Sequence, residues 1–103
     1  MTEMITNEYE SYPVTITRPP ARVSSHRVLA WAELARRDGE YPGGIVLTVR
    51  EDTRYGPEYV TWDAYTKDGG ETWHATEGDF ASDPAEGWQD FTRRAARRRL
   101  ATA

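Results

Sequence analysis

Residues 59–76 read YVTWDAYTKDGGETWHAT, and this stretch predicts a β-hairpin. Two runs rich in β-branched and aromatic residues, 59–66 and 71–76, lie on either side of Asp68-Gly69. Asp-Gly between such runs is a strong hairpin signal, because a two-residue type I′ turn needs positive φ at both of its central positions. We therefore expect two antiparallel strands joined by a tight turn at Asp68-Gly69.

The register of this hairpin determines which side chains share a face. A two-residue turn places Asp63 opposite His74, on a face that we expect to be open, although a bulge at Gly70 would separate the two. The face expected to be buried holds Trp62, Ala64, Trp73 and Ala75. Asp63 and His74 come nearest to an acid–base pair, but the chain has no cysteine and no serine in a nucleophile-like turn. We interpret the pair as a surface contact and predict no catalytic site, no metal site and no cofactor.

The eight residues from Thr66 to Trp73 also match the pattern Ser/Thr-x-Asp-x-Gly-x-Thr-Trp. This pattern resembles the Asp-box of sialidase-like β-propellers, in which it stabilises a hairpin turn away from the catalytic site. The chain holds one copy and is far too short for a propeller, whose blades repeat the motif. The resemblance therefore implies a turn geometry and no glycosidase activity.

The N-terminal half gives weaker signals. Residues 1–11 are polar and acidic, and we expect a flexible arm there. Strands are predicted at 12–17 and 45–50 from their β-branched residues. Residues 25–38 are ambiguous: neither strand face separates apolar from polar residues, whereas a helix places several apolar side chains on one arc. These are Val28, Trp31, Ala32, Leu34 and Ala35, and we therefore predict a helix.

The C-terminal element is predicted by its start signals. Asp83 suits the N-cap of a helix, Pro84 suits the first helical position, and Glu86 completes a capping box. Its apolar face is formed by Ala85, Trp88, Phe91, Thr92 and Ala95. The sequence therefore predicts an amphipathic helix that begins at Pro84.

Together these elements predict an α+β fold with the order β-α-β-β-β-α. Residues 12–103 are expected to form one domain, in which both helices pack on one face of a small antiparallel sheet. The expected core is Trp31, Leu34, Trp62, Trp73, Trp88 and Phe91.

Charge is divided unevenly along the chain, whose formal total is −4. Residues 1–90 contain all 17 acidic residues, whereas residues 91–103 contain five arginines and no acidic residue. On the predicted helix, one basic face is formed by Arg93, Arg94, Arg97 and Arg98. Such a face can bind phosphates or an acidic protein partner. It can also be structural, because Asp90 is placed to pair with Arg94 and cations complement the dipole at a helix C-terminus.

From residue 25 onward, the predicted order α-β-β-β-α resembles that of a double-stranded-RNA-binding domain, including Gly56-Pro57 before the second strand and a basic final helix. In that family lysines cluster at the start of the last helix, where they straddle phosphates. Here that start is Asp83-Pro84-Ala85-Glu86, and the basic residues lie at the far end. The resemblance implies nucleic-acid binding through residues 93–99, which we keep as the alternative function.

Composition limits the remaining function classes. Four Trp, six Tyr and two Phe in 103 residues can fill a small core, so disorder is not expected. No stretch approaches the roughly 20 apolar residues of a membrane span, and the absence of cysteine fits a cytoplasmic protein. Twelve Arg against one Lys is typical of GC-rich coding DNA, which would suit a phage or mobile-element accessory protein. We predict a non-enzymatic interaction or regulatory module that binds another protein through Tyr59, Tyr65 and His74 or through the arginine-rich helix end.

Overall fold

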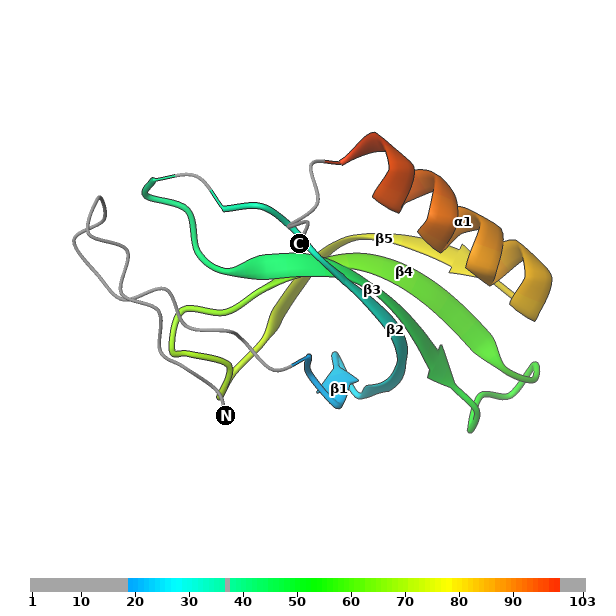
Figure 1. The fold of residues 1–103 in the computed structure, drawn as a ribbon. Helices are drawn as coiled ribbons and strands as arrows, with labels where there is room; N and C mark the ends of the chain where they lie inside the picture. Colours follow the sequence, from blue (N-terminus) through cyan, green and yellow to red (C-terminus); the bar gives the residue numbers. More distant parts are fainter. Residues whose placement is uncertain (1–18, 37, 99–103) are drawn as a thin grey trace, which may run out of the picture.

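The computed structural model describes residues 19–36 and 38–98. In this part of the chain, five strands form one antiparallel sheet in the order β1-β2-β3-β4-β5, and one helix follows them. The elements are β1 (Arg22–Val23), β2 (His26–Glu33), β3 (Gly43–Arg50), β4 (Glu58–Tyr65), β5 (His74–Ala81) and α1 (Pro84–Arg97). Figure 1 shows a curled sheet with α1 lying along one face. The α+β class is therefore confirmed.

The two faces of the sheet carry different side chains. The helix face, which α1 covers, includes Leu47, Tyr59, Thr61, Asp63, Tyr65, His74 and Asp79. The tryptophan face, on the opposite side, includes Val28, Trp31, Val46, Trp62, Ala64, Trp73 and Ala75, with Val23 of β1 packed against them. Because both faces are covered, the central strand β3 is buried from Gly44 to Val49.

Residues 25–38 do not form the predicted helix. Most of this segment is β2 (His26–Glu33), which pairs with β3 and has a bulge between Val28 and Ala30. The bulge adds one residue to the strand, so Val28 and Trp31 share the tryptophan face although they are three residues apart. Three-residue spacing is also helical spacing, and the apolar pattern of this strand therefore imitates that of a helix.

With a strand at this position, the predicted order β-α-β-β-β-α is wrong, and so is the topology resembling a double-stranded-RNA-binding domain. The described residues contain one helix rather than two. The strands expected at 45–50 and 59–66 are found as β3 and β4. The arm expected at 1–11 and the strand expected at 12–17 lie outside the described residues.

β4 and β5 form the predicted hairpin, but the connection is longer and the register differs. The loop spans Thr66–Trp73, and Tyr65 lies opposite His74. Asp63 consequently lies opposite Thr76, so the expected Asp63–His74 pair does not form. The expected turn was too short because hydrogen bonds from side chains, and not the Asp-Gly dipeptide alone, set the length of this loop.

The Thr66–Trp73 loop is held by the residues that anchor the Asp-box pattern. Thr66 Oγ1 donates to Asp68 Oδ1 at 2.8 Å and accepts from the Gly70 N–H at 2.9 Å. Asp68 Oδ1 also accepts from the Thr72 N–H at 2.8 Å. The hydrogen bonds to Asp68 stabilise its carboxylate and lower its pKa to about 2. The bond from the Thr72 backbone N–H makes the largest contribution.

α1 begins where the sequence predicts, with Pro84 in the first turn and Asp83 accepting a hydrogen bond from the Ala85 N–H at 3.1 Å. It packs on the helix face, however, and not against the tryptophans of the sheet. Gly87 is buried at this contact, where an added Cβ would lie 2.9 Å from Tyr59 Cβ. Trp88, expected in the core, is 45 % exposed. The expected one-sided core is therefore wrong, because α1 approaches through a glycine rather than through its largest apolar side chain.

Candidate functional site

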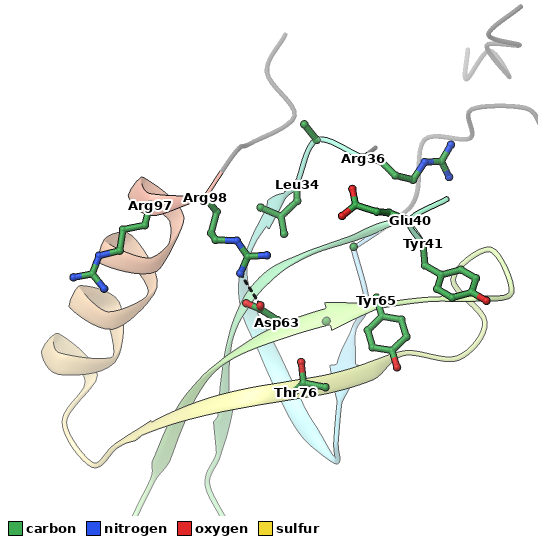
Figure 2. A pocket seen from close by; sticks show the side chains of 12 residues that line it. Leu34, Arg36, Glu40, Tyr41, Asp63, Tyr65, Thr76, Arg97 and Arg98 are labelled. Atoms are coloured by element: carbon green, nitrogen blue, oxygen red, sulfur yellow. Dashed lines mark hydrogen bonds and ion pairs between the residues drawn. The ribbon is translucent and has the colours of Figure 1, made fainter. Parts of the chain in front are cut away.

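A pocket of about 580 Å³ opens on the helix face, between the C-terminal end of α1 and the connection that joins β2 to β3 (Figure 2). Its polar and aromatic lining includes Glu40, Tyr41, Asp63, Tyr65, Thr76 and Arg98. These residues come from the β2–β3 connection, β4, β5 and α1. Only the folded chain brings them together, so the pocket is a preformed feature of the fold.

Three stacked rings lie beside the pocket, and we call Tyr41, Tyr65 and His74 the aromatic row. Tyr65 and His74 are direct cross-strand neighbours, with ring centroids 5.0 Å apart and an interplanar angle of 23°. Tyr41 stacks on Tyr65 with centroids 6.1 Å apart and an angle of 19°. The Lys67 ammonium lies 5.4 Å from the centre of the Tyr41 ring, a cation–π contact. Tyr41 remains 54 % exposed and is open to a ligand.

Asp63 and Arg98 line the pocket near α1 and belong to an ion-pair network that also includes Asp79 and Arg94, which we call the Arg–Asp network. Asp63 accepts from Arg94 at 3.3 Å through Oδ1 and from Arg98 at 2.6 Å through Oδ2. Arg94 also binds Asp79 on β5. The Arg94 and Asp63 side chains are 15 % and 19 % exposed, so water screens this pair less than an ordinary surface pair. The network holds the end of α1 against β4 and β5.

The four arginines predicted as one basic face, Arg93, Arg94, Arg97 and Arg98, lie in different environments. Arg94 and Arg98 turn toward the sheet and belong to the Arg–Asp network. Arg93 binds Asp90 at 3.2 Å, in place of the expected Asp90–Arg94 pair. Arg97 lines the pocket, but its side chain points away from the Arg98 contact in Figure 2. Aspartates therefore neutralise most of the charge at this end of α1. Asp63 and Asp79 lie far from the arginines in the sequence, so counting charges along the chain does not reveal these pairs.

The sheet residues predicted as a binding surface are also divided. Tyr65 and His74 belong to the aromatic row, as their cross-strand register requires. Tyr59 is half-buried beneath Gly87 of α1, because the helix covers the face that we expected to be open. Arg99 lies outside the described residues. The structure therefore places Tyr65 and Arg98 in the lining of one pocket, with His74 stacked on Tyr65, whereas Tyr59 does not line this pocket.

Tyr41 is the site residue that the sequence patterns did not indicate. It follows the segment wrongly predicted as a helix and precedes Gly43, which lies opposite Tyr65. A Cβ on Gly43 would lie 2.5 Å from Ala64 O and 3.3 Å from Tyr65 Cβ, so glycine permits the close approach of β3 to β4 here. The available sequence signal was Gly43-Gly44 shortly after Tyr41. Two glycines in a strand indicate that neighbouring backbone approaches closely there, and an aromatic residue next to them can lie beside that contact.

Within residues 19–36 and 38–98, no group of three or more His, Asp or Glu side chains is arranged to hold a metal ion. In the same ranges, no helix has the length and the apolar character needed to cross a lipid bilayer. Comparison of the chain with protein-family models, curated proteins and solved structures gives no significant match. We therefore derive a function from the geometry of the pocket and of the side chains around it.

Proposed function

We propose that this chain is a small protein-interaction module that binds a polypeptide segment of its partner in the pocket, against the aromatic row. The observation that carries this proposal is the placement of Tyr41, Tyr65 and His74, stacked together beside a preformed pocket. Tyrosines are enriched where proteins bind one another, because a rigid ring gives a large contact area and loses little conformational entropy.

The charges around the pocket favour a polypeptide over a nucleic acid. Arg93, Arg94 and Arg98 are each paired with an aspartate, so a phosphate would have to compete for them. The rest of the chain is strongly acidic and would repel a polyanion. A peptide, by contrast, need not displace these ion pairs, because its side chains can contact the aromatic row instead.

Peptide selection tests this proposal even though the partner is unidentified. Peptides from a random display library are selected on the full chain, and their affinities are measured for the wild type and for Tyr41→Ala. We expect binding to weaken about tenfold, the effect of losing a contact worth about 1.4 kcal/mol. Tyr55→Ala is the matched control, because Tyr55 is 89 % exposed and lies outside this pocket. Selected peptides that bind both variants equally well would contradict the proposal.

A nucleic-acid titration at low salt tests the alternative. We expect no salt-dependent binding of duplex RNA or DNA, since most of the helix arginines already have carboxylate partners. Binding that is lost in an Arg93→Gln, Arg97→Gln double variant would replace the polypeptide proposal with nucleic-acid recognition through the outer side of α1.

A further inference from the structure

His26 lies at the start of β2 and is buried, with 6 % of its surface exposed. It faces Val23 across the two-residue turn that joins β1 to β2. Its ring contacts Trp62 edge to face, with centroids 5.9 Å apart. His26 thus connects the short β1–β2 hairpin to the tryptophan face.

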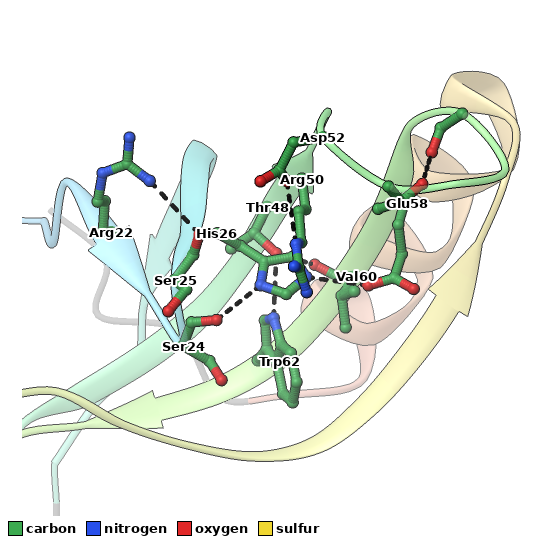
Figure 3. Close-up of polar contacts among 12 residues, drawn as sticks. Arg22, Ser24, Ser25, His26, Thr48, Arg50, Asp52, Glu58, Val60 and Trp62 are labelled. Atoms are coloured by element: carbon green, nitrogen blue, oxygen red, sulfur yellow. Dashed lines mark hydrogen bonds and ion pairs between the residues drawn. The ribbon is translucent and has the colours of Figure 1, made fainter.

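Both ring nitrogens of His26 face hydrogen-bond acceptors (Figure 3). Nδ1 lies 2.8 Å from the backbone oxygen of Ser24, and Nε2 lies 3.0 Å from Glu58 Oε1. A carbonyl oxygen and an ionised carboxylate accept hydrogen bonds and cannot donate them, whereas a neutral imidazole has only one N–H. The two bonds therefore coexist only when an additional proton is held between Nε2 of His26 and the carboxyl group of Glu58.

These two bonds anchor the turn of a short hairpin, whose other main contact is the buried side chain of Val23. β1 contains two residues, and within the described part of the chain it pairs only with β2. The turn residues Ser24 and Ser25 have φ values of 50° and 68°, a left-handed conformation that costs energy for residues other than glycine. Val23 is 1 % exposed because the closed hairpin packs it against Val46 and Ala64.

Other charged groups surround His26 but do not replace this proton. Arg22 of β1 donates to the Ser25 backbone oxygen at 3.4 Å. Arg50 at the end of β3 binds Asp52 at 3.0 Å, and this hydrogen bond lowers the pKa of Asp52. The carboxylate that contacts the imidazole directly is that of Glu58.

We propose that His26 and Glu58 form a proton-dependent latch that closes the β1–β2 hairpin over the tryptophan face. With the extra proton, Nδ1–H donates to Ser24 and the proton at Nε2 bridges to Glu58. When that proton is lost to solvent, one of the two bonds is lost and the strained turn loses its anchor. This latch is independent of the proposed peptide pocket, which lies on the opposite face of the sheet.

Amide exchange in the full chain tests the latch, with the protection factor of the Val28 N–H as the readout. This amide donates to Ala21 O at 3.0 Å across the hairpin. As the pH is raised from about 5 to about 8, we expect its protection to fall about fivefold to tenfold, the effect of losing one hydrogen bond. Protection of Leu47 in the central strand should stay constant. Constant protection of Val28 across this range would overturn the proposal.

Glu58→Gln distinguishes a latch from general loosening. The glutamine amide can donate to Nε2 of a neutral imidazole, while Nδ1–H still donates to Ser24, so both bonds form without the extra proton. We expect Val28 to stay protected at every pH in this variant, whereas His26→Gln should give low protection at every pH. His74→Gln, which removes the other histidine of the chain, should keep the wild-type pH dependence. An unchanged pH dependence in Glu58→Gln, or its loss in His74→Gln, would contradict the latch.

Discussion

The tryptophan face and the helix face belong to one sheet but are covered by different kinds of contact. On the tryptophan face, aromatic rings meet edge to face, as Trp31 and Trp73 do at 5.3 Å. On the helix face, α1 is held by close approach at Gly87 and by ion pairs to Asp63. An apolar face shows in the sequence as an alternating pattern, whereas an ion-paired face has the composition of an exposed surface. This difference explains why α1 was expected on the wrong side of the sheet.

The largest effect should come from the tryptophan face. Trp62 contacts His26 and Phe80, and its Nε1–H donates to Thr48 Oγ1 at 3.0 Å. We expect Trp62→Ala to lower the free energy of unfolding by about 3 kcal/mol, through lost burial and a cavity. Phe80→Ala should cost about 1 kcal/mol or less, because Phe80 is 59 % exposed. Urea denaturation measures both variants, and equal losses would contradict the assignment of Trp62 to the core.

The next effect should come from the Arg–Asp network. Asp63→Ala leaves Arg94 with Asp79 alone and Arg98 without its carboxylate, so we expect a loss of about 1–2 kcal/mol. Arg93→Gln is the control, because its pair with Asp90 lies within one helix turn and Arg93 is 54 % exposed. Removing the Arg93–Asp90 pair should change the free energy of unfolding by about 0.5 kcal/mol or less. Equal effects in denaturant unfolding would show that α1 is not held by Asp63.

Thr48 and Thr61 allow the two faces to be compared at equal burial, because both side chains are 0 % exposed. Thr48, on the tryptophan face, donates to Val60 O at 3.0 Å and accepts from Trp62. Thr61 Oγ1, on the helix face, has no hydrogen-bond partner in the described part of the chain. We expect Thr48→Val to destabilise by about 1–2 kcal/mol and Thr61→Val to stabilise by about 1 kcal/mol. Thermal unfolding measures the signs, and a loss in both variants would contradict the difference between the faces.

The smallest effect concerns the Thr66–Trp73 loop, which joins β4 to β5. The pKa of Asp68, about 2, lies below the ordinary carboxyl value of 3.8, because the folded loop stabilises the carboxylate. Its contribution to stability is therefore present above pH 4 and is lost as the pH falls through about 2. The Thr72 amide shift in NMR should report this step, and Asp68→Asn should remove it. A step at the ordinary carboxyl value would contradict the hydrogen-bonded loop.

Sequence patterns predicted the parts of the fold that local chemistry determines. Asp83-Pro84 marked the start of α1, and β-branched runs marked β3 and β4. The bulge between Val28 and Ala30 could not be predicted from the neighbouring sequence, because its position depends on how β2 pairs with β3. The hairpin register was missed for a related reason: hydrogen bonds from Thr66 and Asp68 lengthen the loop.

The candidate site was predicted only in part. Tyr65 and His74 were identified from the hairpin, and the structure stacks them even though the expected register was wrong. Arg98 was identified from its charge, but its role as the partner of Asp63 depends on where α1 packs. Tyr41 belongs to a connection whose position follows from β2 being a strand, so the glycines after it could mark closely packed strands but could not identify Tyr65 as its neighbour.

The most direct test of the proposed binding site is an NMR titration of the labelled chain with a peptide selected on it. The pocket on the helix face predicts that the largest backbone amide shift changes occur at Tyr41, Tyr65 and His74. Amides of the tryptophan face, such as that of Trp31, should change little because they lie on the far side of the sheet. Shift changes centred on Trp31 and Trp73, or on Trp88 and Arg93 of the outer helix surface, would contradict the proposed site.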